Sequence, residues 1–121
     1  MLNLSLKKRW WFIIRTIILT QNDYGISFEI TVIDSQKKPV SLLDTNVYVE
    51  VILPDLSKKI KQCEIINATD GIVEIVLDKT DTSQIGVYNL YVVIESEVFK
   101  VTSNRPAIYY VQADDGGAIN A

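Results

Sequence analysis

The sequence contains no histidine and only one cysteine, Cys63. Histidine is the most common general base and a frequent zinc ligand, and Ser–His and Cys–His nucleophile pairs require it. A single cysteine forms no internal disulfide, which favours synthesis in a reducing compartment. The sequence also lacks a glycine-rich phosphate loop and the acidic spacing of a calcium loop. We therefore expect no enzymatic activity, no cofactor and no metal, and we interpret Cys63 as a packing residue.

Basic charge is also scarce, because 12 basic residues face 15 acidic ones and the net charge is −3. Only Lys7, Lys8 and Arg9 form a basic run, whereas nucleic-acid binding needs a basic face, so we expect no nucleic-acid partner. The apolar stretch that follows is interrupted by Arg15 and is about ten residues long, well below the ~20 that cross a bilayer. We interpret it as a strand and expect no membrane partner.

What the sequence does contain is short apolar runs that alternate with polar residues and end at turn signals. Ile26, Phe28, Ile30 and Val32 alternate in this way, which indicates a strand with one buried face. Asp70-Gly71 between two such runs is a strong hairpin signal. The expected strands are 10–20, 26–32, 47–53, 58–66, 72–77, 87–95, 98–102 and 107–111, with one helical turn at 82–85.

About eight strands without a long helix predict an all-β fold, and we expect an immunoglobulin-like antiparallel β-sandwich of about 7–9 strands. Tyr88, at the start of an apolar strand, has the position of the tyrosine whose hydroxyl binds upstream backbone in such domains. Residues 1–112 are expected to form one domain. Residues 113–121 contain Asp114-Asp115-Gly116-Gly117 and are expected to be a flexible tail or the start of a linker.

Two aromatic segments are candidates for an interface. Trp10, Trp11 and Phe12 are consecutive, and neighbours on a strand face opposite ways, so at most one of the tryptophans is buried in this domain's own core. The other is free to fold over the domain edge or to contact a partner, since tryptophan is enriched in interface hot spots. Tyr109 and Tyr110 pose the same question, and we take all five as candidate interface residues.

The order of the turn motifs resembles the amino-terminal immunoglobulin-like domain of the phage baseplate upper protein family. The resemblance covers about residues 10–112, and its landmarks are Lys38-Pro39-Val40-Ser41-Leu42, Leu53-Pro54-Asp55, Asn67-Ala68-Thr69-Asp70-Gly71 and Gly86-Val87-Tyr88. The chain departs from the family pattern at Ser41, Leu43 and Asp44, and at Leu56, which stands where the family has glycine. These departures affect two turns and leave the strand order unchanged.

The resemblance implies a virion structural protein of a phage or prophage tail, made in the cytoplasm of a host bacterium. Its expected partners are other baseplate and tail proteins and the arm that carries the receptor-binding protein, and we expect a homo-oligomer in the assembled particle. The alternative is a carbohydrate- or cell-surface-binding β-sandwich that uses Tyr48, Tyr109 and Tyr110. An enzyme built on paired carboxylates would need two acids, among Glu29, Glu50 and Glu74, to face one cleft.

Overall fold

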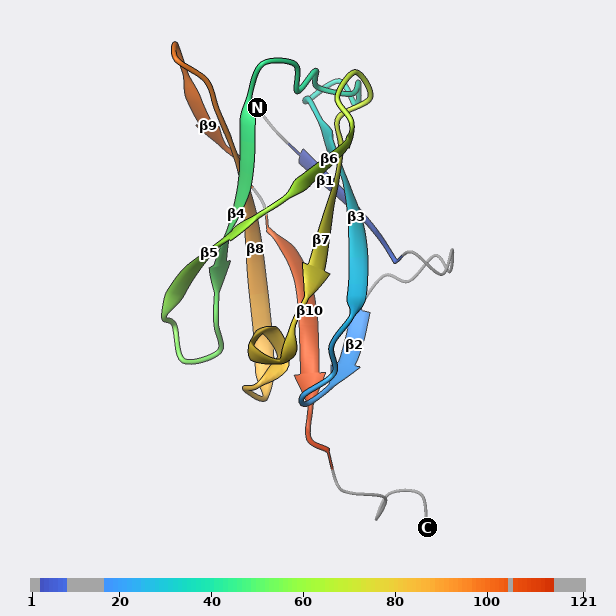
Figure 1. The fold of residues 1–121 in the computed structure, drawn as a ribbon, viewed down its shortest axis with the longest axis vertical. Coiled ribbons are helices and arrows are strands. Elements are labelled where there is room, and N and C mark those ends of the chain that lie inside the picture. Colours follow the sequence, from blue (N-terminus) through green and yellow to red (C-terminus); the bar gives the residue numbers. More distant parts are fainter. Residues whose placement is uncertain (1–2, 9–16, 105, 115–121) are drawn as a thin grey trace.

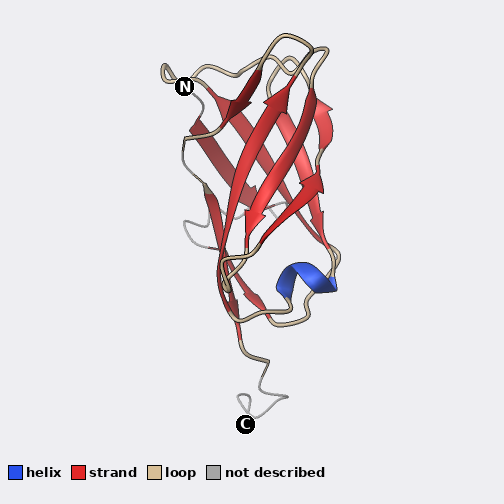
Figure 2. Ribbon diagram, turned by 90° about the vertical axis from the view of Figure 1, so that its left-hand side faces the viewer, coloured by secondary structure: helices blue, strands red, loops and turns tan. Residues whose placement is uncertain are grey.

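The computed structural model describes residues 3–8, 17–104 and 106–114, and for residues 3–8 it describes the backbone alone. Almost all regular structure in this part of the chain is β (Figures 1 and 2). The strands are β1 (Asn3–Lys8), β2 (Ile17–Thr20), β3 (Ile26–Ile33), β4 (Asn46–Ile52), β5 (Lys58–Gln62), β6 (Glu64–Asn67), β7 (Ile72–Leu77), β8 (Gly86–Glu95), β9 (Lys100–Thr102) and β10 (Ala107–Gln112). One short 3-10 helix, η1 (Lys79–Thr82), precedes β8.

The strands form two sheets that pack face to face. Sheet A has the order β1-β3-β7-β6, and sheet B has the order β2-β10-β8-β4-β5, with β9 pairing with β8. All neighbours are antiparallel except β2 and β10, which are parallel. The all-β sandwich predicted from the sequence is confirmed. The order also matches the ABED and GFC sheets of immunoglobulin-type domains, with β2 and β5 added at the edges of the second sheet; the immunoglobulin-like assignment itself stays a prediction.

The strand count differs from the expected 7–9 for two reasons. β1 was not expected, although it pairs with Phe28–Ile33, the last six residues of β3. The expected strand 58–66 is two strands, because the chain crosses from sheet B to sheet A at Cys63 (Figure 1). β5 pairs with β4, and β6 pairs with β7, while the Cys63 backbone N–H donates to the Val47 carbonyl at 3.3 Å.

Alternation along the strands produces the core, as expected for strands with one buried face. Phe28, Ile30 and Val32 of β3 are fully buried and belong to one core cluster with residues of β4, β7, β8 and β10. The other core residues are Ile17, Leu19, Leu42, Val47, Val49, Val51, Val73, Ile75, Leu77, Tyr88, Leu90, Val92, Ile94, Ala107, Tyr109 and Val111. Their outward neighbours on the same strands form the two outer faces of the sandwich.

The helical turn lies three residues earlier than predicted, at Lys79–Thr82 instead of 82–85. The reason is local capping, since the Asp78 side chain accepts hydrogen bonds from the backbone N–H groups of Thr80 and Asp81. The Asp81 side chain in turn accepts from the Asp78 backbone N–H at 2.8 Å, which completes a capping box. Asp78 therefore starts the turn before Thr82 is reached.

The Asp70-Gly71 turn is confirmed as the connection of the β6–β7 hairpin. Gly71 has φ +68°, and a Cβ there would lie 2.7 Å from the carbonyl oxygens of Val32 and Val40. The close approach exists because the Gly71 carbonyl accepts a hydrogen bond from the Val32 N–H at 2.8 Å. Only glycine meets both demands at this position.

The end of the last strand bears on the expected division into a domain and a tail. β10 ends at Gln112, and the division into a domain of residues 1–112 and a tail of residues 113–121 stays a prediction. The described part of the chain contains no helix with the length and hydrophobicity that a membrane span needs.

Candidate functional site

Of the five aromatic residues expected at an interface, the structure describes the side chains of two. Trp10, Trp11 and Phe12 lie outside the described residues. Tyr109 does not reach the surface: its side chain is fully buried and its hydroxyl donates to the Asp81 carbonyl at 2.6 Å. This corrects the expectation that Tyr109 is available to a partner. Tyr110 points the other way and is 39% exposed, so alternation along β10 separates the two tyrosines.

Tyr110 belongs to an apolar area on the outer face of sheet B. In the register of the sheet it pairs with Ile18 of β2 on one side and with Val87 of β8 on the other. Ile108 lies two residues along β10 and therefore on the same face. The exposed fractions of Ile18, Val87, Ile108 and Tyr110 are 55%, 43%, 44% and 39%. We call these four residues the sheet B patch.

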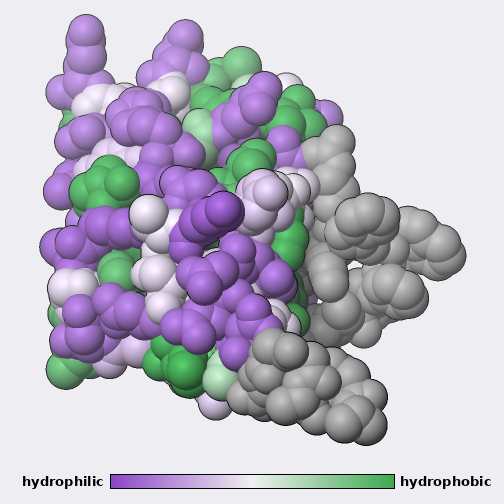
Figure 3. Space-filling view, turned by 60° about the horizontal axis from the view of Figure 1, so that its bottom comes forward, coloured by the Kyte–Doolittle hydropathy of each residue, from purple (hydrophilic) through white to green (hydrophobic). Residues whose placement is uncertain are grey.

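The end of the sandwich that carries η1 presents a different surface. Hydrophilic side chains dominate this end, and hydrophobic areas are separated from one another (Figure 3). Beneath it lies a buried carboxylate, Asp81, which forms ion pairs with Lys59 and, at 2.8 Å, with Lys61. Both lysines come from the edge strand β5 and face the interior, an arrangement that discourages edge-to-edge pairing. We interpret this cluster as structural, since it joins β5 to η1.

The carboxylates considered for catalysis are divided between the two sheets. Glu29 and Glu74 are direct partners in the β3–β7 register, and Glu64 pairs with Glu74 from the other side, all on the outer face of sheet A. Glu50 lies on the outer face of sheet B, where it pairs with Lys58 at 3.7 Å. Among the residues described, no group of histidine, cysteine and acidic side chains is arranged to hold a metal ion.

Cys63 lies at the crossover between the sheets and is partly buried against the core. Burial raises the pKa of its thiol from the ordinary 9.0 to about 12, and nearby Lys61 lowers it only in part. The thiolate is the reactive form of cysteine, so this environment suppresses reactivity at neutral pH. The geometry agrees with its interpretation as a packing residue.

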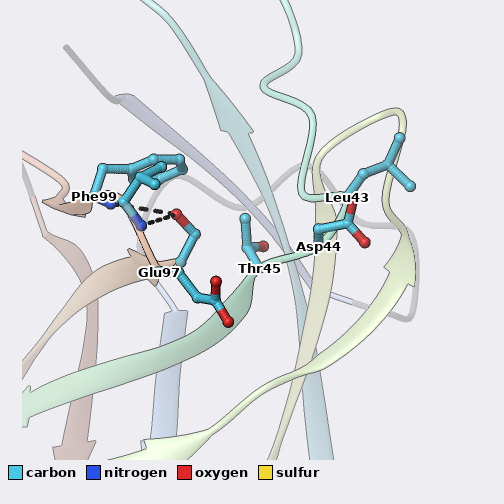
Figure 4. Close-up of a pocket in the computed structure, with 7 residues that line it drawn as sticks. Leu43, Asp44, Thr45, Glu97 and Phe99 are labelled. Atoms are coloured by element: carbon cyan, nitrogen blue, oxygen red, sulfur yellow. Dashed lines mark hydrogen bonds between the residues drawn. The ribbon is translucent and has the colours of Figure 1, made fainter.

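A pocket of about 400 Å³ lies between two loops (Figure 4), at the opposite end of the strands from η1 (Figure 1). One loop leads into β4 and contributes Leu43, Asp44 and Thr45, and the other joins β8 to β9 and contributes Ser96, Glu97, Val98 and Phe99. In Figure 4, Leu43 and Asp44 lie on one side and Phe99 on the other, with Thr45 and Glu97 between them. Its walls thus combine apolar side chains with two carboxylates.

Sequence reasoning did not find most of these surface residues. Ile18, Val87 and Ile108 had a detectable signal, because they are apolar residues in the outward phase of their strands. Leu43 and Phe99 had a weaker signal, since Leu43 is an apolar residue beside an expected turn and Phe99 belongs to the expected strand 98–102. The two residues are 56 positions apart in the sequence, which gives no hint that they approach. The pocket depends on the pairing of β4 with β8.

No protein-family model matches the sequence, and no curated protein matches it. Similar folds occur in the endo-β-1,4-mannanase from Thermotoga petrophila (11% identity, TM-score 0.49), in a family 123 glycoside hydrolase from Clostridium perfringens (10%, 0.40) and in AggA, the major subunit of aggregative adherence fimbriae type I from Escherichia coli (8%, 0.36).

The coverage of these structures is uneven. The alignments take in 93%, 94% and 94% of this chain, but only 20% of the mannanase and 28% of the glycoside hydrolase, against 96% of the fimbrial subunit. The chain therefore spans a minor part of the two hydrolases. At these identities and TM-scores the similarities carry no argument about function.

Proposed function

We propose that this chain is a non-enzymatic structural protein of a phage or prophage tail, which docks an adhesin-bearing arm to the core of the baseplate. The observation that carries the proposal is the sheet B patch. Ile18, Tyr110 and Val87 stand side by side across three strands, and Ile108 extends the row along β10. Contiguous exposed apolar side chains on a sheet face are typical of a surface that a neighbouring protein covers.

The energetics of the patch suit an assembled particle. Each of its side chains is about half exposed, and burying apolar surface stabilises an association by roughly 25 cal/mol per Å² before the costs of ordering are subtracted. Tyr110 adds a polar hydroxyl at the edge of an apolar ring, a combination that is enriched in interfaces. The turn motifs quoted above support the baseplate as the place of assembly, and the partners are then other baseplate proteins and further copies of this chain.

The test is whether tail particles contain the chain and whether the patch retains it there. Particles are purified from a host that carries the gene, and the chain is located with an antibody in a cryo-EM map. The Ile108→Thr, Tyr110→Ser double variant should fold with an unchanged unfolding midpoint but be missing from the particles. The matched control is Ile66→Thr, Val76→Thr, which removes two residues of 47% and 51% exposure from the outer face of sheet A. A chain absent from tails, or equal incorporation of both double variants, contradicts the proposal.

The second candidate is carbohydrate binding. Tyr48 and Tyr110 both lie on the outer face of sheet B and are partly exposed, whereas Tyr109 is buried and provides no platform. A glycan array discriminates between the two functions. Binding in the sub-millimolar range that is lost in Tyr48→Ala or Tyr110→Ala, while the Tyr24→Ala control binds normally, favours the carbohydrate function over docking.

A further inference from the structure

The pocket between the two loops at the end of the β4–β8 ladder is a second surface, separate from the sheet B patch. Val87 lies at the start of β8 and Ser96 directly after its end, so these two residues are about 30 Å apart along the strand. An inference about this pocket does not depend on the docking function proposed for the patch.

Both walls of the pocket are held in place by their own hydrogen bonds. The Ser96 hydroxyl oxygen accepts from the backbone N–H groups of Val98 and Phe99 at 3.2 and 3.3 Å, and the Phe99 carbonyl accepts from the Ser96 N–H at 2.8 Å. On the other side, the Thr45 hydroxyl donates to the Leu42 carbonyl at 2.7 Å. Because Leu42 is itself buried in the core, the loop that carries Leu43 is fixed to the sandwich. The walls are therefore ordered before a ligand arrives, which lowers the entropic cost of binding.

Three apolar side chains that line the pocket are exposed. Leu43, Val98 and Phe99 are 62%, 88% and 45% exposed. All three line one hollow, although the first comes from the loop before β4 and the other two from the β8–β9 turn. The hollow therefore has apolar surface from both loops.

Two carboxylates accompany these apolar groups. Asp44 and Glu97 line the pocket, and within the described part of the chain neither forms an ion pair. Asp44 has φ +57°, a conformation that aspartate and asparagine tolerate better than most residues. A cationic group at the rim would gain attraction from both carboxylates, whereas the phosphates of nucleic acid or of an anionic lipid would be repelled.

We propose that this pocket binds a protein partner through one large apolar side chain that lies next to a lysine or arginine. The apolar side chain occupies the hollow between Leu43 and Phe99, and the basic group pairs with Asp44 and Glu97. The charge complementarity sets the choice of partner, and the burial of Val98 and Phe99 supplies the binding free energy.

The test uses three capped dipeptides as probes and records the backbone amide resonances of the full chain by NMR. N-acetyl-Phe-Arg-amide should shift the amides of residues 43–45 and 96–99 with saturation in the millimolar range. N-acetyl-Phe-Glu-amide should bind much more weakly because its charge is repelled, and N-acetyl-Gly-Arg-amide because it has no apolar side chain. Equal binding of the first two probes, or no shift at this pocket, overturns the proposal.

Substitutions in the pocket test whether dipeptide binding depends on Asp44, Glu97 and Val98. Glu97→Gln and Asp44→Asn should each weaken the binding of N-acetyl-Phe-Arg-amide by about two- to fivefold, the range of an exposed ion pair, while Glu64→Gln on β6 removes the same charge elsewhere and should change nothing. Val98→Ser should weaken all binding, in contrast to Val76→Ser on sheet A. If Glu64→Gln lowers the affinity as much as Glu97→Gln, only the net charge matters and the proposed site is wrong.

Discussion

The rings of Tyr88 and Tyr109 stack in the core with their centroids 4.6 Å apart and their planes at 10°. The two hydroxyls serve different segments of the loop before β8. The Tyr88 hydroxyl accepts from the Gln84 N–H at 2.9 Å and donates to the Gln84 carbonyl at 3.2 Å. The Tyr109 hydroxyl donates to the Asp81 carbonyl. The stacked pair thus holds η1 and its following loop against the end of sheet B, and the expected backbone contact of Tyr88 is confirmed.

Removing the Tyr109 hydroxyl should destabilise the fold, whereas removing that of its neighbour should not. Tyr109→Phe leaves the buried Asp81 carbonyl without its donor and should lower the free energy of unfolding by about 1–2 kcal/mol. Tyr110→Phe changes an outward-facing ring and should have almost no effect. Urea unfolding followed by fluorescence measures both. Equal losses would mean that the assignment of inward and outward tyrosines is wrong.

The stability of the protein should fall as the pH rises above about 9. Burial and the charge of Asp81 raise the pKa of Tyr109 above its ordinary 10.0, and burial raises the pKa of Cys63 from 9.0 to about 12. The unfolded chain therefore releases these two protons at a lower pH than the folded chain does. Because the unfolded state then binds fewer protons, alkali favours unfolding.

Unfolding midpoints measured from about pH 8 to about pH 11 test this dependence. Tyr109→Phe and Cys63→Ala should each make the alkaline fall in stability shallower, since each removes one of the groups responsible. Tyr24→Phe is the control, because Tyr24 is 64% exposed. A slope that does not change in Tyr109→Phe and Cys63→Ala would contradict the explanation.

Two glycines with similar backbone angles should respond differently to alanine. Gly71 and Gly25 have φ of +68° and +76°, but a Cβ at Gly71 meets two carbonyl oxygens at 2.7 Å and a Cβ at Gly25 meets nothing within 4 Å. Gly25→Ala should cost about 1 kcal/mol for the left-handed backbone alone. Gly71→Ala adds a displacement of β3 or of the segment at Val40, and should cost about 2–4 kcal/mol. Thermal unfolding measures the loss of stability in the two variants. Equal losses would contradict the close approach of the two carbonyl oxygens to Gly71.

The ion pairs of Asp81 should contribute much more than an exposed pair. Asp81 is fully buried, and its partners Lys59 and Lys61 have side-chain exposures of 30% and 19%. Asp81→Asn keeps the shape of the side chain but leaves the partly buried Lys59 without its counter-charge and Lys61 with only the more distant Asp78 at 3.6 Å, so we expect a loss of about 2 kcal/mol. Glu50→Gln breaks a pair with Lys58, which is 55% exposed, and should cost at most about 0.5 kcal/mol. Denaturant titrations measure the free energy of unfolding of both variants. Similar losses for Asp81→Asn and Glu50→Gln would contradict this prediction.

The course of the strands was predictable because it follows from local chemistry. Ile26–Ile33 and Ile72–Leu77 show period-two alternation, and Asp70-Gly71 supplies the turn conformation between β6 and β7. Two errors came from non-local effects. β1 is defined by its pairing with β3, which is distant in the sequence. The break at Cys63 arises because the first half of the expected strand 58–66 pairs with β4 in sheet B and the second half pairs with β7 in sheet A. The position of η1 was missed although its signal, the aspartate capping box, is in the sequence.

The sequence by itself determined that the chain alternates between two kinds of face, and its lack of histidine removes the commonest catalytic groups. For β10 it left open which face is inside, because apolar and aromatic residues occupy both phases of this strand and neither Tyr109 nor Tyr110 is thereby assigned to the core. Only the tertiary structure decided this, through the register of β10 between β2 and β8. It also brought Leu43 and Phe99 to one pocket, since the ends of strands distant in sequence meet only when the sheet has formed.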